Sequence, residues 1–137
     1  MDSNLKIFFS LALVILISIY VGFFREGKFY ENSLSVLTQE PNLSAIVDNI
    51  SIQKSGFVVL YDDEGGLPNN IIGNSYILDK GEYTDLVVNF NRASKNGEKK
   101  YGILYEDDGD RRFSPVDVIV ARDANGDPII VPFTIQR

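Results

Sequence analysis

Three acidic stretches hold most of the side chains that could do chemistry in this chain of 137 residues. They are Asp62-Asp63-Glu64, Glu106-Asp107-Asp108 and Asp123–Asp127, the last of which reads Asp-Ala-Asn-Gly-Asp. The sequence contains no histidine and no cysteine, which excludes Ser-His-Asp and Cys-His nucleophilic catalysis and the usual ligand sets for zinc, copper and haem. What remains is oxygen chemistry, from carboxylates, amides, hydroxyls and backbone carbonyls.

Asp123, Asn125 and Asp127 place oxygen ligands at alternate positions, as calcium loops do, and hard cations prefer such ligands. The EF-hand pattern also requires a later glutamate, and none occurs in Pro128–Ile135. Asn125-Gly126 between two apolar stretches is instead a leading hairpin signal. We therefore predict a hairpin turn, no metal site and no cofactor, with a Ca²⁺-binding turn at these three residues as the alternative.

An internal echo relates two of the acidic stretches. Phe57–Gly65 and Gly102–Gly109 each read as an apolar strand that ends in tyrosine and runs into three acids and a glycine. We interpret both as charged turns that end strands; the alternative is two loops that share a cation site at one end of the domain. A glycosidase would need two carboxylates held across a cleft, and a domain of this size leaves little surface for one. We predict no catalytic residue and no enzymatic activity.

The run from Ile7 to Phe24 indicates the cellular location of the protein. It has no charged residue and no proline, with Lys6 before it and Arg25 and Lys28 after it. As a helix it reaches roughly 27 Å, close to the thickness of the hydrocarbon core of a bilayer. We predict a transmembrane anchor whose ends are Ile7 and Phe24. A cleaved signal peptide remains an alternative, although the run is long for one and lacks a small-x-small exit. A buried helix of a soluble fold and a type IV pilin helix are the others.

The predicted location is the cell membrane, with a single pass and the C-terminal domain outside the cytoplasm. The Lys and Arg count near the run weakly favours the opposite orientation, but long domains translocate largely regardless of charge. The bilayer is the predicted partner, with envelope proteins or surface polymers as further partners. Nucleic acid is excluded, because the net charge is -6 and phosphate binding needs a positive field.

Three segments follow from composition: residues 1–24 as a short head and anchor, 25–42 as a linker, and 43–137 as one domain. The domain alternates short apolar stretches with glycine, asparagine and proline turns, which predicts an all-β, Ig-like antiparallel sandwich of about seven strands. The predicted strands are Ser44–Ile52, Gly56–Tyr61, Ile71–Leu78, Tyr83–Phe90, Lys100–Tyr105, Val116–Ala121 and Ile129–Ile135.

Periodicity also predicts which side chains face the core. Gly56–Tyr61 is apolar on both faces, as a strand covered on both sides would be. In Ser44–Ile52 the isoleucines at 46, 50 and 52 share one face. In Tyr83–Phe90 the residues at 84, 86, 88 and 90 point one way, and those at 83, 85 and 89 point the other.

Three stretches resemble an uncharacterised domain family that is common in secreted and surface-anchored proteins of haloarchaea and also found in bacteria. They are GFVVLYDD (Gly56–Asp63), IIGNSYILDKGEYTDLVVNF (Ile71–Phe90) and YGILYEDDG (Tyr101–Gly109). The positions that match are Gly56, Gly73, Ser75, Leu78 and Gly81. The resemblance covers roughly Ile46 to Phe133 and implies an extracytoplasmic β-sandwich with no established activity. Family members often carry histidine where this chain has Tyr61 and Tyr105.

These observations predict a membrane-anchored extracytoplasmic β-sandwich with a structural or binding role. The alternative is a calcium-dependent surface module that binds carbohydrate or another polymer through its acidic loops.

Overall fold

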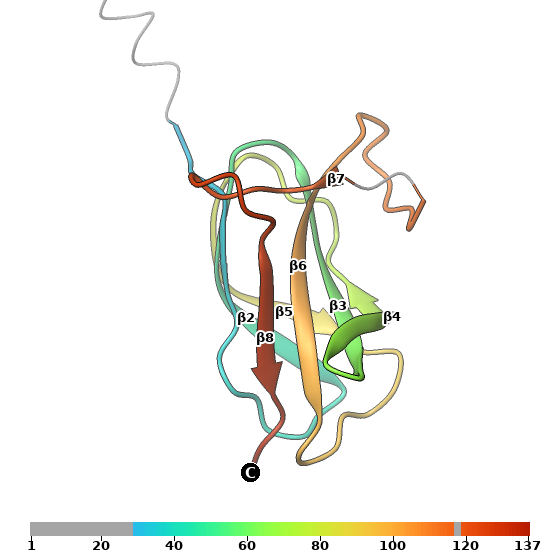
Figure 1. Cartoon of the computed structure of the whole chain (residues 1–137). Coiled ribbons are helices and arrows are strands. Elements are labelled where there is room, and N and C mark those ends of the chain that lie inside the picture. The colour runs from blue at the N-terminus through green and yellow to red at the C-terminus, as the bar shows by residue number, and fades with distance from the viewer. Residues whose placement is uncertain (1–28, 117–118) are drawn as a thin grey trace, which may run out of the picture.

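The computed structural model describes residues 29–116 and 119–137 (Figure 1). These residues form two antiparallel sheets with eight strands and no helix, so the predicted all-β fold is confirmed. The strands are β1 (Ser33–Ser35), β2 (Ser44–Ile52), β3 (Gly56–Glu64), β4 (Leu67–Asn74), β5 (Gly81–Asn89), β6 (Lys99–Glu106), β7 (Ile119–Val120) and β8 (Ile130–Thr134).

The first sheet has the strand order β1-β2-β5. The second has the order β4-β3-β6, and β7 and β8 both pair with the remaining edge of β6. The chain after β1 joins the second sheet through a parallel bridge between Gln39 and Ile135. Both β1 and Gln39 lie within the segment interpreted as a linker, and Val36 between them is buried. The folded part of the chain therefore begins before Leu43.

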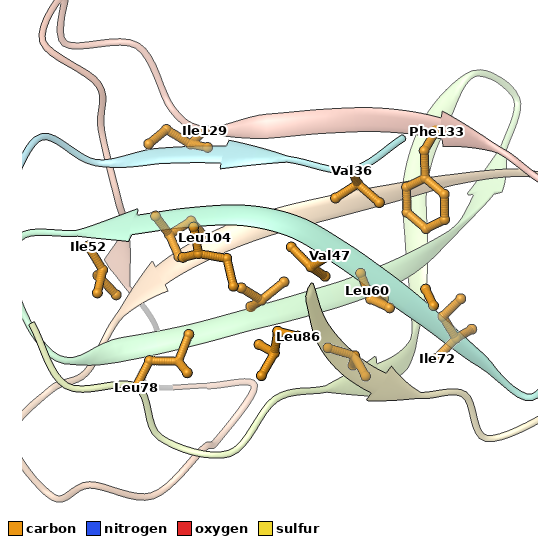
Figure 2. Close-up of a cluster of buried hydrophobic side chains, with 14 of the residues drawn as sticks. Val36, Val47, Ile52, Leu60, Ile72, Leu78, Leu86, Leu104, Ile129 and Phe133 are labelled. Atoms are coloured by element: carbon orange, nitrogen blue, oxygen red, sulfur yellow. The ribbon is translucent and has the colours of Figure 1, made fainter. Parts of the chain in front are cut away.

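The main core lies between the two sheets (Figure 2). As predicted, β3 is buried on both faces: Val58 and Leu60 point into this core, whereas Phe57 and Val59 belong to a second cluster on the outer face of the five-stranded sheet. Phe113, from the loop after β6, packs edge-on against Phe57 with ring centroids 5.7 Å apart. This second cluster explains why the strand shows no polar face.

The alternation predicted for β5 is correct at one end and wrong at the other. Leu86, Val88 and Phe90 are buried, but Thr84 is exposed and Tyr83 packs against the core. Asp85 has a φ of 51°, in the left-handed region, and this changes the face to which the following side chains point.

The neighbouring strand β2 changes face at the same level. Ala45 and Val47 point inward and so do Ile50 and Ile52, whereas Ile46 is exposed, contrary to the predicted isoleucine face. The pairing with β5 keeps its register on both sides of the change. β2 and β5 change face at the same level, so both strands keep apolar side chains on the core side of the sheet along their length.

The hairpin between β3 and β4 is tighter than predicted. β4 begins at Leu67 rather than Ile71 and ends at Asn74. Gly65 and Gly66 have φ values of 62° and 86°, which most side chains avoid and glycine adopts freely. A two-residue turn is therefore sufficient, and most of the expected loop is strand.

Candidate functional site

The end of the sandwich opposite the start of the described chain gathers a group of ionic side chains, of which sequence analysis had singled out only Asp62. We call it the distal end; it comprises the Gly65-Gly66 turn and residues 90–98, and the C-terminus lies beside it (Figure 1). Asp62 of β3 and Lys100 of β6 are paired residues near this end. Because paired residues in a sheet project to the same face, both side chains point between the sheets, in the row of Leu60 and Leu104.

Lys100 is a buried cation, with a side chain that is only 1 % exposed. Its Nζ lies 2.6 Å from Asp62 Oδ1 and 3.4 Å from Glu98 Oε2, and it sits 5.7 Å from the centre of the Phe90 ring. Burying an ammonium group is costly unless it is paired and hydrogen-bonded. The carboxylates of Asp62 and Glu98 provide that pairing, and they lie at the end of the core where Lys100 is buried.

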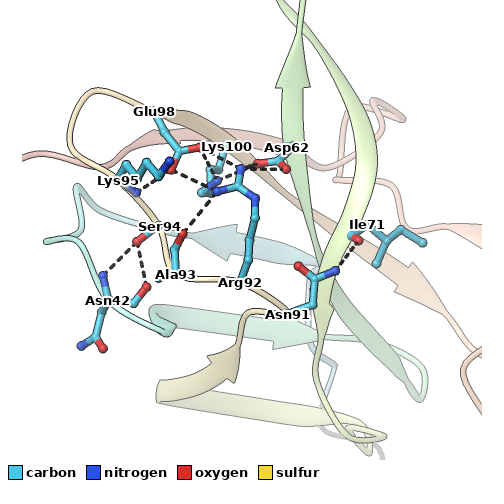
Figure 3. A network of polar contacts seen from close by, with 10 residues as sticks. All are labelled: Asn42, Asp62, Ile71, Asn91, Arg92, Ala93, Ser94, Lys95, Glu98 and Lys100. Atoms are coloured by element: carbon cyan, nitrogen blue, oxygen red, sulfur yellow. Dashed lines mark hydrogen bonds and ion pairs between the residues drawn. The ribbon is translucent and has the colours of Figure 1, made fainter.

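Arg92, whose side chain is partly exposed, contacts the same two carboxylates (Figure 3). Its Nη2 donates to both carboxylate oxygens of Asp62, at 2.9 and 3.0 Å, and to Glu98 Oε2 at 2.8 Å. The hydrogen bond from Arg92 is the main reason that the pKa of Glu98 falls to about 2, and it outweighs the effect of burial. The same two carboxylates raise the pKa of Arg92, chiefly through Glu98. Two cations and two anions thus form one compact network.

The loop that carries Arg92 is fixed by a second set of contacts. Ser94 Oγ donates to the carbonyl of Asn42 at 3.0 Å and accepts the amide of Asn42 at 2.9 Å (Figure 3). The amide of Ser94 also donates to the Asn42 carbonyl. Segments 52 residues apart are therefore locked together, which holds the guanidinium in place.

A polar recess of about 450 Å³ adjoins the network. Three members of the network line it, and so do five further polar residues: Asp62, Arg92 and Glu98, with Asp63, Glu64, Asn69, Asn70 and Lys99. Carboxylate and amide oxygens and the nitrogens of Arg92 and Lys99 face this recess, so it offers both hydrogen-bond acceptors and donors.

The two acidic loops of the internal echo do not meet. β3 and β6 are antiparallel neighbours in which Gly56 pairs with Glu106 and Asp62 with Lys100. Their acidic ends consequently lie at opposite ends of the sheet, and the alternative of one shared cation site is wrong. The same separation means that these two loops cannot place one carboxylate each across a single cleft.

The loop after β6 contains a separate acidic group. Carboxylate oxygens of Asp107, Asp108 and Asp110 lie within 4.8 Å of one another. Oδ1 of Asp107 is buried and has no hydrogen-bond partner among the described residues. The loop also ties its carboxylates to its own backbone: Asp107 accepts the amide of Arg111 at 3.0 Å and Asp110 that of Arg112 at 2.8 Å.

Asp123, Asn125 and Asp127 lie in a closed turn, as the hairpin interpretation predicts. Asp123 Oδ1 accepts the amides of Asn125 at 2.9 Å and Asp127 at 3.0 Å, and the backbone bond from Asp123 N to Asp127 O closes the hairpin at 2.9 Å. Gly126 takes a φ of 82°. One carboxylate oxygen is therefore used to hold the turn.

Sequence analysis did not predict the roles of Lys100, Arg92 and Glu98. Charged residues that lie close to other charged residues in a sequence are typical of a solvated surface. One signal was present in the sequence: Lys100, Gly102 and Leu104 occupy alternate positions, so a strand that buries Leu104 on the core side also directs Lys100 there.

The fold and these sites define the class: a small all-β protein of two packed antiparallel sheets. Residues 32–135 match the model of the family described as "Domain of unknown function (DUF7282)", and the chain belongs to that family. Searches of curated proteins and of solved structures found no match.

Within residues 29–116 and 119–137, no helix has the length and apolar character needed to cross a membrane. Ile7 and Phe24, the ends of the predicted anchor, lie outside the described residues.

Proposed function

We propose that this chain is a single-pass, membrane-anchored, extracytoplasmic module with a structural or binding role and no enzymatic activity. The observation that carries the proposal is the uncharged run Ile7–Phe24. Only four residues separate it from Phe29, where the described part of the chain begins. A helix of this length matches the bilayer core. The resemblance to secreted and surface-anchored proteins supports the same location.

The arrangement of the domain suits such a role. The start of the described chain lies at one end of the sandwich, and the Gly65-Gly66 turn and residues 90–98 lie at the other (Figure 1). The polar recess adjoins this second end. A module tethered through its N-terminus would present the recess, the Gly65-Gly66 turn and residues 90–98 away from the membrane. Envelope proteins or surface polymers are the partners that this geometry would reach, and a net charge of -6 argues against nucleic acid.

We also propose that the sandwich is Ig-like. β1, β2 and β5 are arranged as strands A, B and E of an Ig domain, and β3, β6 and β8 as strands C, F and G. Such modules bind through loops and sheet faces, and fold alone assigns no activity. The missing histidine and cysteine and the ion-paired carboxylates of the recess support a non-enzymatic role.

Cell fractionation tests the anchor. The full chain should sediment with membranes and remain there after washes with high salt and with alkali, whereas a chain that lacks residues 1–24 should be soluble. Protease added to intact cells should digest the domain if it lies outside the cytoplasm. A soluble wild-type protein of shortened mass would show a cleaved signal peptide, and protection from external protease would reverse the orientation.

A calcium-dependent module that binds carbohydrate or another polymer is the second candidate function. The grouping of Asp107, Asp108 and Asp110 favours it, because hard cations bind clustered oxygen ligands. Calcium titration, with variants in each acidic loop, separates it from the first proposal.

A further inference from the structure

The outer face of the β1-β2-β5 sheet carries a groove of about 500 Å³. Ile46 and Val87, which are paired residues of β2 and β5, form an apolar patch with Leu37 beside them. Their exposed fractions are 46 %, 57 % and 64 %. A contiguous exposed apolar patch with a polar rim is a feature of binding surfaces, unlike apolar side chains scattered singly.

Acids occur beside this apolar patch. Asp48 and Asp85 lie on the two neighbouring strands, between the pairs Val47–Leu86 and Asn49–Thr84, and both line the groove together with Glu40. Like charges that face each other across two strands destabilise a sheet. Within the described residues, no basic side chain lines the groove.

The backbone is strained at the same place. Asp85 is one of two described residues other than glycine with a positive φ, and it lies within a strand. A left-handed residue of this kind has an energetic cost, and such residues concentrate at functional sites. Here the left-handed residue marks the point where the strand changes face, beyond which Val87 points outward.

One wall of the groove is held rigidly. The side-chain amide of Gln39 donates to the carbonyls of Leu37 and Ile46, at 2.9 and 3.0 Å, and its oxygen accepts the amide of Ile46 at 2.9 Å. Asp48 Oδ2 accepts the amide of Leu37 at 2.7 Å. The backbone of Ile46 is therefore already satisfied, so that a ligand would be recognised through the side chains of the groove rather than by adding a strand beside β2.

The lining selects the chemistry of the ligand. The part of the chain that the structure describes contributes to it no aromatic ring on which a sugar or a base would stack and no cation that would hold a phosphate. Its apolar side chains complement an apolar partner, and its acids complement a positive one. We propose that this groove binds a basic, apolar peptide segment of a partner protein, with lysine or arginine beside Asp48 and Asp85 and an aliphatic side chain on Ile46 and Val87.

The inference rests on the proposed binding role but not on the proposed anchor. It is tested with the full chain in a non-ionic detergent and a fluorescent peptide, acetyl-Lys-Val-Lys-Val-Lys-Val-amide, by anisotropy. Saturable binding is expected, and it should weaken as salt is added because the attraction is partly ionic. Two control peptides should each bind at least about tenfold more weakly. A Lys-Ser peptide of equal charge lacks the aliphatic side chains, and a Ser-Val peptide without charge lacks the lysines.

Matched variants locate the site. Asp85→Asn keeps a residue type that tolerates the left-handed conformation, and Val87→Ser removes the apolar contact; each should weaken binding by about fivefold or more. Glu82→Gln, on the same strand, and Ile130→Ser, on the other sheet, remove an exposed acid and a half-exposed aliphatic group and should change nothing. If Val87→Ser fails to fold, Asp85→Asn and Glu82→Gln still decide the question.

Three results would overturn the inference: no saturable binding up to about 1 mM peptide, equal binding of the Lys-Ser peptide, or binding unaffected by both groove variants. Concentration-dependent dimerisation that Asp85→Asn abolishes, without peptide binding, would assign the groove to a second copy of the chain instead. Membrane fractionation is independent of all these results, so failure here and failure of the anchor are distinguishable.

Discussion

The phenol oxygens of Tyr61 and Tyr105 lie 2.7 Å apart on the outer face of the five-stranded sheet. Each of the two residues ends the apolar part of one of the two similar stretches, Phe57–Gly65 and Gly102–Gly109. Because their strands are antiparallel, they project from positions on either side of the Val59–Ile103 pair and meet above it. Burial, followed by the hydrogen bond with Tyr105, raises the pKa of Tyr61 above its ordinary value of 10.0.

This shift predicts a loss of stability in alkali. The neutral phenol of Tyr61 is favoured in the folded state, so its contribution is present below pH 10 and is lost as the pH rises above 10, where the unfolded chain ionises. Tyr61→Phe should cost about 1 kcal/mol at neutral pH through the lost hydrogen bond. It should also make the stability curve above pH 10 less steep, as measured by urea unfolding. Tyr76→Phe, at an exposed tyrosine, is the control; an equal change in slope there would contradict the assignment.

The Glu98 network predicts the opposite dependence at low pH. The pKa of Glu98 is lowered from 4.5 to about 2. Its contribution to the free energy of unfolding is therefore present above pH 4.5 and is lost as the pH falls toward 2. Glu98→Gln should lower stability at pH 7 by about 1–3 kcal/mol, because Arg92 and Lys100 each lose an anionic partner. Melting temperatures recorded from pH 7 to pH 2 should show the variant losing less than wild type below pH 4.5. The exposed Glu82→Gln should follow the wild-type curve, and a Glu98→Gln curve parallel to wild type would refute the role of the network.

Two glycines of the central strands should respond very differently to alanine. A Cβ on Gly56 would lie 1.9 Å from the backbone oxygen of Tyr105, whereas one on Gly102 would first meet Leu34 Cδ2 at 3.3 Å. A side chain can shift by a few tenths of an ångström, but the Tyr105 carbonyl cannot move without disturbing the pairing of β3 with β6. Gly56→Ala should therefore cost about 3 kcal/mol or more and Gly102→Ala about 1 kcal/mol, measured by denaturant unfolding. Similar costs would mean that the close approach at Gly56 is absent in solution.

Periodicity predicted most of the sandwich because it reports directly on burial, and burial decides which side chains a strand can carry. It was wrong at Thr84 and Ile46 because alternation assumes extended backbone throughout. Asp85 has a left-handed conformation. Aspartate tolerates this conformation, but its presence in a sequence does not predict it. A single such residue reverses the faces of everything that follows.

The charged network of Asp62, Arg92, Glu98 and Lys100 could not be predicted from periodicity, because it depends on which strands pair and in which register. Asp62 and Lys100 are 38 residues apart, and only the register of β3 against β6 brings them together. The same register separates the two acidic loops, which the echo had suggested could meet. Local pattern predicts the strands and their buried faces, whereas the partners of each charge follow from the pairing of strands distant in the sequence.

Calcium titration decides between the two proposed functions. At about 100 times its dissociation constant, a specifically bound ion would add about 2.7 kcal/mol of stability, which is roughly 10 °C or more in melting temperature for a domain of this size. We expect a small change that magnesium or sodium reproduces at equal ionic strength, because exposed carboxylates are merely screened.

The variants in this titration test each acidic loop separately. Asp123→Ala should lower stability by about 1 kcal/mol with or without calcium, since Asp123 Oδ1 accepts two amides of the turn. Asp127→Ala, for which the turn uses only the backbone, should be milder. A calcium-specific rise that is abolished by Asp123→Ala or Asp127→Ala would place an ion in the hairpin turn. A rise that survives both variants but is lost when Asp107, Asp108 and Asp110 are changed to asparagine would place it in the loop after β6, and either result would favour the calcium-dependent module over the metal-free one.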